Sequence, residues 1–282
     1  MTEAFALPFF QIAVIASLVL AGIHAYLGFH VVRRGVLFVD LALAQMAALG
    51  VALSVVLEVE HDPVRSYLLA LGMTFIGAAL FAWLRGRARS VPLEAFIGIV
   101  FATAQAVVIL VLEKSPSGPE HLKETLVGSL FTLDPKHLAG IAILYALVSA
   151  VHFALRGPFF EITNDPRAAR ARGRRVFLWD FLFYATFGCV VTVSVQVAGV
   201  LLVFGFLVIP AVAGLIATSR TGPALTLGWV FGVLGSVLGL LGSVTWDLPA
   251  APSILVALTA LLVALSAVLG IVRAAVKARE TT

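Results

Sequence analysis

The chain has 282 residues, of which 61% are hydrophobic and only 12% are charged. Soluble domains carry about twice that fraction of charge, so this composition, with a mean hydropathy of +1.08, excludes an ordinary soluble domain and predicts a membrane protein. The net charge of +4 does not indicate nucleic-acid binding, because the basic residues cluster between apolar segments and are expected to set membrane orientation. The single cysteine, Cys189, excludes disulfides and cysteine metal clusters within one chain.

Long apolar segments recur along the whole chain. A helix needs roughly 20 apolar residues to cross the hydrocarbon core, so we predict an all-α, polytopic membrane protein with a single transmembrane domain over residues 1–282. The first segment is too long for a signal-peptide core and lacks a basic leader. Only Ala198 and Gly199 separate the sixth segment from the seventh, and either could be re-entrant, so we expect eight or nine crossings. The segments are 7–32, 36–57, 66–84, 93–112, 137–155, 177–197, 199–218, 224–243 and 254–272.

The basic residues test this topology. With the N-terminus outside, 15 of the 19 Lys and Arg residues fall in cytoplasmic segments, which is the bias that the positive-inside rule describes. We therefore expect a multi-pass membrane protein with a cytoplasmic C-terminus. Two long loops result, an external one over about 113–136, with an amphipathic piece at 122–131, and a cytoplasmic one over about 156–176.

The cytoplasmic loop predicts a short basic surface helix. Asn164 or Asp165 can cap a helix whose first position is Pro166, and alanines such as Ala168 favour its continuation. Gly173 is a natural stop. The loop is then either a solvated basic segment or a docking helix for a cytoplasmic partner.

Two polar residues interrupt the second segment. A carboxylate at the bilayer centre costs about 2.5–3.5 kcal/mol, so Asp40 is expected to face protein or water. It either pairs with Arg33 or Arg34 near the cytoplasmic boundary or lines a substrate path. Gln45 lies deeper, and a hydrogen bond between helices would be enough to explain it. The two residues are five positions apart, about 140° around a helix, so they do not form one ligand face.

Other polar residues lie within the predicted spans, namely His24, His30, Gln105, His152, Asp180 and Gln196. A lone helical histidine is expected to hydrogen-bond to a neighbouring helix rather than to bind a metal. The sequence contains no H-E-x-x-H motif and no G-x-x-x-x-G-K-[ST] phosphate loop, which argues against a zinc protease and against ATP hydrolysis by this chain.

Proline and glycine mark the seventh and eighth segments. Pro210, with Gly205 close by, should kink or break its helix, either passively or to line a cavity. Small residues at spacings of three and four place a glycine face on the eighth segment, which predicts close packing with a helix of the same chain or of a second copy. These glycines are Gly228, Gly232, Gly235, Gly239 and Gly242.

Several blocks, in order from about residue 33 to about residue 270, carry a resemblance: RRGVLFVDLALAQMAALGVALS, LEAFIGIV, LVGSLFTLDPKHL, AGVLLVFGFLVIPAVAG and DLPAAPSILV. With them the chain resembles the membrane subunit of metal-type ABC importers, the permeases for zinc, manganese and iron. The resemblance implies a type II ABC importer permease fold, a homodimeric pore in the lipid bilayer, separate cytoplasmic ABC ATPase subunits and an extracytoplasmic metal-binding protein. It implies no cofactor and no enzymatic activity of this chain.

The resemblance also suggests site residues. Residues 165–173 occupy the position of the family's coupling helix, so Asp165, Pro166, Ala168 and Gly173 are expected to couple the chain to the ATPase. The candidate residues of the substrate pathway are Asp40, Gln45, Gln105 and Pro210.

One departure concerns the metal. The second helix of the family usually carries an aspartate and, four residues on, a histidine, a pair suited to a divalent transition metal. Leu41 and Gln45 stand at those positions, and Asp40 is one place early, about 100° away around the helix. The metal ligands therefore stay unassigned. The alternatives are a permease of the same fold for another solute, a secondary carrier that uses Asp40 and Asp180, and, more distantly, an intramembrane enzyme.

Overall fold

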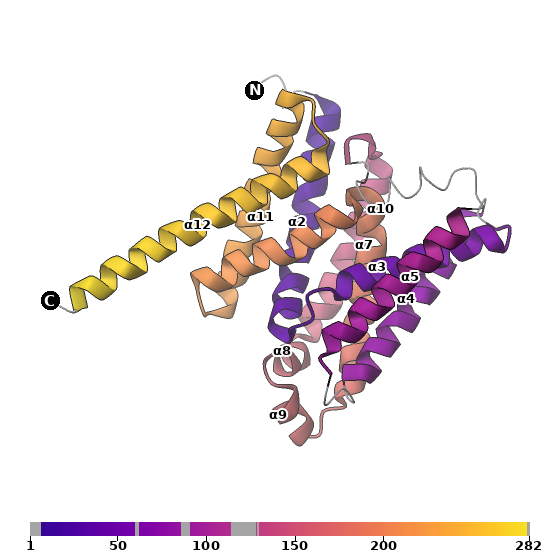
Figure 1. Ribbon diagram of the computed structural model, residues 1–282, viewed down its shortest axis with the longest axis horizontal. Coiled ribbons are helices and arrows are strands. Elements are labelled where there is room, and N and C mark those ends of the chain that lie inside the picture. Colours follow the sequence, from indigo (N-terminus) through magenta and orange to yellow (C-terminus); the bar gives the residue numbers. More distant parts are fainter. Residues whose placement is uncertain (1–6, 60–61, 86–90, 114–127, 129, 281–282) are drawn as a thin grey trace. The chain divides into compact units, whose positions relative to one another are not determined.

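The computed structural model describes residues 7–59, 62–85, 91–113, 128 and 130–280, and their regular structure is entirely helical (Figure 1). The elements are α2 (Pro8–Arg34), α3 (Val39–Val56), α4 (Pro63–Arg85), α5 (Leu93–Leu112), the 3₁₀ turn η1 (Leu130–Thr132), α7 (Pro135–Ala154), α8 (Arg156–Asn164), α9 (Pro166–Ala171), α10 (Val176–Ala217), α11 (Thr221–Trp246) and α12 (Ala250–Glu280). Most of the amphipathic piece predicted at 122–131 lies outside the described residues.

Eight of these helices are long and apolar enough to cross a membrane. Each predicted segment corresponds to an observed helix, and the bounds of the fourth, 93–112, are those of α5. Helices dominate because a chain in lipid must satisfy its backbone donors and acceptors within the segment itself. The prediction of an all-α, polytopic membrane protein is confirmed.

Helix α10 contains the sixth and seventh predicted segments. Its 42 residues correspond to about 63 Å of helix, twice what one crossing needs. Gly199, with φ 74° and ψ 157°, interrupts the helical backbone between 176–198 and 200–217. The break predicted beside Ala198 is therefore confirmed. Of the kink or break predicted at Pro210, the break is wrong, because the backbone there keeps helical dihedral angles, and the kink stays a prediction.

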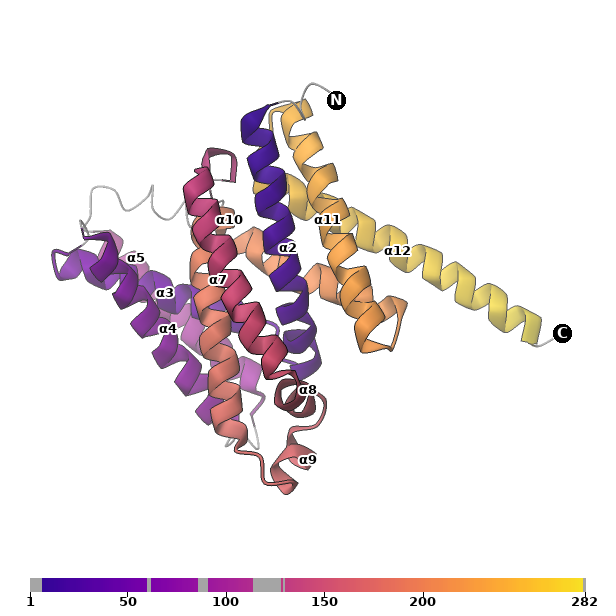
Figure 2. The same ribbon diagram turned by 180° about the vertical axis from the view of Figure 1, so that it is seen from behind.

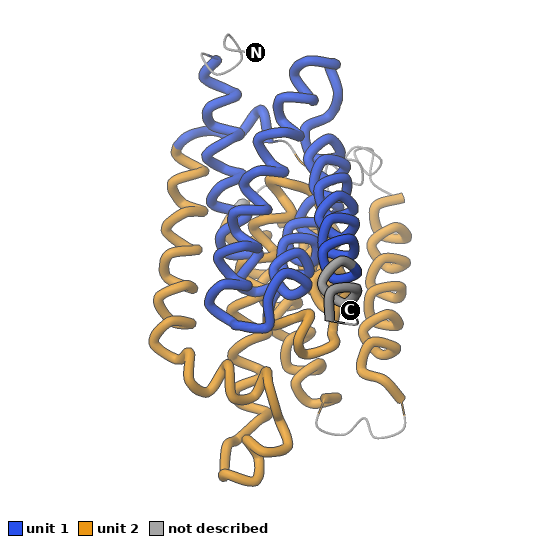
Figure 3. Tube along the Cα trace, turned by 90° about the vertical axis from the view of Figure 1, so that its left-hand side faces the viewer, with its two compact units in different colours: residues 1–29, 130–135, 201–282 blue, residues 30–129, 136–200 orange. Residues whose placement is uncertain are grey.

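The chain divides into two compact units, which Figure 3 colours separately. Unit 1 comprises 1–29, 130–135 and 201–282, and unit 2 comprises 30–129 and 136–200. Both units draw on several stretches of the chain, and α2 and α10 contribute to both. The division therefore does not follow a single cut along the sequence.

Unit 2 is built around α3 and the first part of α10. Helices α3, α4 and α5 pack side by side (Figures 1 and 2). The first part of α10 hydrogen-bonds to α4, where the Thr74 and Thr192 hydroxyls lie 3.2 Å apart. It also bonds to α7, where the Tyr145 hydroxyl lies 2.5 Å from that of Ser194. Buried hydroxyl pairs thus join the first part of α10 to both α4 and α7.

In unit 1, the glycine face of α11 packs against other helices of the same chain. A Cβ at Gly228 would lie 2.7 Å from the Pro210 carbonyl oxygen, and one at Gly232 would lie 3.2 Å from Ala21 Cβ. Gly235 and Gly239 face Leu258 and Ile254 of α12. Gly242 faces Trp246 of its own helix. Four of the five glycines therefore allow close approach of α2, α10 and α12, which answers the question of whether the partner helices belong to the same chain.

We predict that Gly239→Ala destabilises the protein, because the added methyl group would collide with the backbone of Ile254. Overpacking of this kind costs about 1–3 kcal/mol. Thermal unfolding in detergent should show a Tm several degrees below that of the wild type. The matched control is Gly222→Ala on the same helix, where the methyl group meets nothing within 4 Å. Equal Tm values for the two variants would contradict the packing that we describe.

Candidate functional site

Two short helices occupy the segment between α7 and α10. Helix α9 begins at Pro166, and the Asp165 carboxylate caps it by accepting hydrogen bonds from the Arg167 and Ala168 backbone N–H groups, both at 2.9 Å. The predicted cap and first position are confirmed, although Asn164 ends α8 instead of capping α9. Helix α8 was not predicted, because Gly157 and Pro158 near its start are typical of a loop.

Helix α9 ends where the sequence predicts. Gly173 has a φ of +82°, which favours glycine. Its N–H donates to the Arg170 carbonyl and the Arg174 N–H donates to the Ala169 carbonyl, both at 3.0 Å. This pair of bonds is a Schellman motif, which satisfies the last carbonyls of a helix. The predicted stop at Gly173 is confirmed.

The α8–α9 segment packs on the start of α10. Ile162, Ala169 and Val176 form one buried apolar cluster, and Trp179 packs against it. Glu161 pairs with the Nε atoms of Arg172 and Arg174 at 2.8 and 3.0 Å. Exposed arginines on and beside α9, namely Arg167, Arg170 and Arg175, give the segment a basic surface. A fixed element with a charged surface is suited to binding another protein.

We predict that Asp165→Ala loosens α9, since loss of an N-cap costs about 1 kcal/mol. Hydrogen exchange of the backbone amides in 167–172 should accelerate roughly fivefold. Asp165→Asn keeps an oxygen that can cap the helix, so it should exchange like the wild type. Equal acceleration in both variants would show that the carboxylate acts through its charge and not through the cap.

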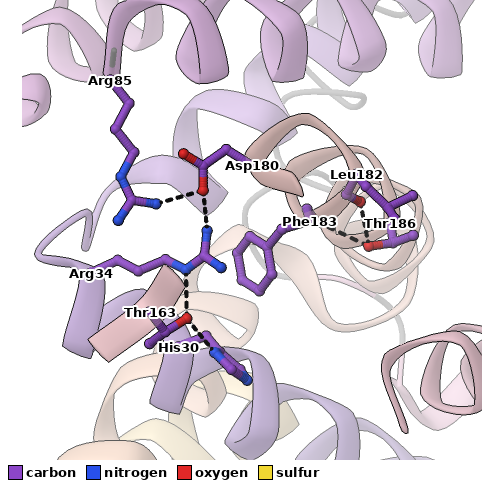
Figure 4. A network of polar contacts seen from close by, with 8 residues as sticks. All are labelled: His30, Arg34, Arg85, Thr163, Asp180, Leu182, Phe183 and Thr186. Atoms are coloured by element: carbon purple, nitrogen blue, oxygen red, sulfur yellow. Dashed lines mark hydrogen bonds and ion pairs between the residues drawn. The ribbon is translucent and has the colours of Figure 1, made fainter. Parts of the chain in front are cut away.

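Two arginines share one carboxylate at the ends of α2 and α4 (Figure 4). The Nη1 atoms of Arg34 and Arg85 each lie 2.8 Å from Asp180 Oδ1 on α10. The side chains of Arg34, Arg85 and Asp180 are 0%, 13% and 1% exposed. Removal of one partner from a buried ion pair costs about 3–5 kcal/mol, so this cluster fixes three helices of unit 2.

Thr163 of α8 joins this cluster. Its hydroxyl accepts a hydrogen bond from Arg34 Nε at 2.9 Å and lies 2.7 Å from His30 Nδ1 (Figure 4). The Arg34 guanidinium also lies 3.9 Å from the ring centroid of Phe183. His30 and Arg34 share one face of α2, and Asp180 and Phe183 share one face of α10, since residues three or four apart are neighbours on a helix.

The pairing of Asp40 with Arg33 or Arg34 is wrong. Asp40 is 1% exposed, and neither of its carboxylate oxygens has a hydrogen-bond partner in the part of the chain that the structure describes. It lies in the first turn of α3, where the positive end of the helix dipole favours a negative charge. Asp40 is therefore a buried carboxylate that no side chain of the described residues balances.

The other predicted pathway residues are spread over three helices. Gln45 is buried on α3, and Gln105 is half-buried on α5, both in unit 2. Pro210 is buried in unit 1 against the glycine face of α11, so its observed contacts are packing contacts. Among the described residues, no group of three or more His, Cys, Asp or Glu side chains is placed to hold a metal ion.

The three histidines that the sequence pointed to, His24, His30 and His152, are hydrogen-bonded. His30 contacts Thr163 of α8, as described above, and His152 Nε2 lies 2.8 Å from the Thr186 hydroxyl on α10. His24 Nδ1 lies 2.8 Å from the Leu20 carbonyl of its own helix. The preference for hydrogen bonding is confirmed, although His24 bonds within its own helix.

A cavity of about 610 Å³ lies within unit 2, between α3, α4, α7 and α10. Its polar lining consists of Ser66, Tyr67, His137 and Gln196. Val51 of α3 also lines it, six residues from Gln45 and so about 9 Å along the helix. Of these residues, the sequence analysis singled out only Gln196, because the others lie at helix ends, where polar side chains are ordinary.

Comparison with known proteins assigns the family. The ABC 3 transport family matches residues 6–269. The chain is 24% identical to the manganese import system permease protein ScaB of Streptococcus gordonii over 206 residues. This alignment covers 72% of the present chain and 70% of ScaB. It is 25% identical over 222 residues to the high-affinity zinc uptake system membrane protein ZnuB of Haemophilus influenzae, covering 77% and 80% of the two chains.

Two solved structures share the fold. PsaBC from Streptococcus pneumoniae, in complex with Fab, superposes with a TM-score of 0.76 at 20% identity, over 94% of this chain and 93% of the other. A structure described as an inward-facing conformation of a putative metal-chelate type ABC transporter superposes with a TM-score of 0.66 at 17% identity. The match covers 91% of this chain and 85% of the other. The predicted permease fold is confirmed. With the family match over nearly its whole length, the chain belongs to the ABC 3 transport family.

Proposed function

We propose that the chain is the pore subunit of an ATP-driven importer for a divalent metal ion. Family membership supports the transport role, and the names of the manganese and zinc permeases among its relatives support the cargo. The sequence has no phosphate loop, so ATP hydrolysis falls to separate cytoplasmic ATPase subunits. In this proposal two copies form the pore in the bacterial cell membrane, the C-termini are cytoplasmic, and an extracytoplasmic binding protein delivers the metal.

The observation that carries the proposal is the construction of the α8–α9 segment. Asp165 caps α9, Gly173 closes it, and Ala169 anchors it to α8 and α10. A segment fixed in this way moves as one body when a partner pushes on it. ATP-driven closure of the ATPase subunits would press on α9 and change the pore from outward-facing to inward-facing.

The polar residues of unit 2 support a cation path along α3. Under the predicted topology, the cavity beside Val51 belongs to the outer half of the membrane, and Asp40 belongs to the cytoplasmic half. The oxygen and nitrogen atoms of the cavity lining are suited to replace part of the hydration shell of an ion. The unpaired carboxylate of Asp40 then supplies a negative charge near the exit.

A permease of the same fold for a non-metal solute is the second candidate. It is favoured by Leu41 and Gln45, which replace the carboxylate and imidazole that the resemblance leads us to expect. Manganese and zinc ions that neither enter vesicles nor compete for uptake would favour this candidate.

We predict that Ala168→Trp uncouples transport from ATP hydrolysis, because Ala168 lies half-buried on the helix that meets the ATPase in this proposal. Metal uptake per ATP hydrolysed in proteoliposomes should fall roughly tenfold, the effect of a contact weakened by about 1.4 kcal/mol. The control is Ala139→Trp, an exposed position on α7 that the proposal does not place at the ATPase. Normal coupling in the Ala168 variant would refute docking at α9.

We predict that Asp40→Asn lowers metal uptake severalfold without lowering Tm, because the change removes a buried charge that no side chain balances in the described chain. Uptake of radioactive manganese and thermal unfolding are measured on the same preparation. Asp62→Asn, which alters an exposed carboxylate, serves as the control. Unaltered uptake, or a fall in both uptake and Tm, would remove Asp40 from the path.

A further inference from the structure

The C-terminal end of α8 is bonded into a buried charge cluster. Thr163 is 3% exposed, and its hydroxyl contacts both Arg34 and His30 of α2 (Figure 4). Two residues later, Asp165 caps α9. The helix expected to meet the ATPase is therefore separated by a few covalent bonds from the ion cluster of unit 2.

Arg34 is the centre of this connection. Its Nε atom donates to Thr163 of α8, while its Nη1 atom donates to Asp180 of α10. A guanidinium group is planar and rigid, so its two contacts cannot move independently of each other. The same oxygen of Asp180 accepts from Arg85, which brings in α4. One chain of hydrogen bonds thus runs from α8 through α2 and α10 to α4.

Burial makes this chain of bonds suited to transmitting movement. The side chains of Arg34 and Asp180 are 0% and 1% exposed, so water does not readily replace a lost contact, and each charge is costly to leave unpaired. Another hydrogen bond between α8 and α2, from Arg33 Nη1 to Asn164 Oδ1, is exposed and 3.4 Å long, and the rings of His30 and Phe160 pack with their centroids 4.6 Å apart. A displacement of α8 is therefore expected to act on the ion cluster through the buried hydroxyl of Thr163, beside the apolar contacts that join α8 to α2 and α10 directly.

We propose that Thr163, Arg34 and Asp180 are positioning residues that transmit displacement of the α8–α9 segment to α2, α4 and α10. This inference rests on the proposed ATP-driven function, since it names the route by which the ATPase would act on the pore. This role goes beyond stability, because the cluster fixes the ends of α2, α4 and α10 relative to the α8–α9 segment.

The test uses two variants of Thr163 in the full transporter with its ATPase subunits. Thr163→Val keeps the shape of the side chain but removes the hydroxyl, and Thr163→Ser restores the hydroxyl. The matched control is Thr192→Val, since Thr192 is another buried threonine that hydrogen-bonds between helices, outside the cluster. Asp180→Asn serves as a second probe. If the Asp180→Asn variant fails to fold, the comparison of Thr163→Val with Thr163→Ser still decides the test.

Manganese ions transported per ATP hydrolysed are the first measurement. We expect Thr163→Val to lower this ratio about tenfold while ATP hydrolysis is retained. A factor of about ten corresponds to the loss of one hydrogen bond to a charged group. Thr163→Ser should restore the ratio, and Thr192→Val should leave it unchanged. A ratio unchanged in Thr163→Val, or a parallel loss of hydrolysis and transport, overturns the proposal.

Hydrogen exchange of the permease without ATP or metal is the second measurement, and it separates this inference from the proposed function. We expect Thr163→Val to accelerate exchange at the end of α4 and the start of α10 as well as in α8. Acceleration confined to α8 overturns the inference. If the wild-type complex shows no ATP-dependent uptake of manganese, the proposed function fails for that cargo, and the exchange pattern alone decides whether the cluster connects these helices.

Discussion

Two arginines that share one buried carboxylate are the constraint on which unit 2 depends. Arg34, Arg85 and Asp180 come from three different helices, and loss of Asp180 would leave two cations without their shared partner. Thr163 extends the cluster to the α8–α9 segment. The same few atoms therefore fix the ends of the membrane helices and connect them to the element that we expect the ATPase to contact.

The rest of the structure follows from packing in an apolar environment. Lipid offers no hydrogen bonds, so the chain forms long helices, and these approach each other closely where side chains are small. The glycine face of α11 receives α2, α10 and α12 of the same chain. Polar groups concentrate in unit 2, at the cavity, the unpaired Asp40 and the ion cluster, and such groups within membrane segments commonly mark transport paths.

Local features could be predicted from the sequence, whereas long-range pairing could not. Asp165, Pro166 and Gly173 act through neighbours within a few residues, so their pattern predicted α9 and both of its ends. Asp180 and Arg34 are 146 residues apart, and nothing in the local sequence indicates that this carboxylate, and not Asp40, is the one that pairs. The break at Gly199 was predictable, whereas the helix continues through Pro210, because a membrane helix packed against its neighbours tolerates an internal proline.

The central claim is that this chain is a pore without an energy source of its own, driven through α8 and α9. The most direct test is manganese uptake into proteoliposomes that contain the purified chain, with and without its ATPase subunits, under an imposed proton gradient. We expect uptake only when the ATPase and hydrolysable ATP are both present. Uptake by the chain alone, driven by the proton gradient, would contradict it.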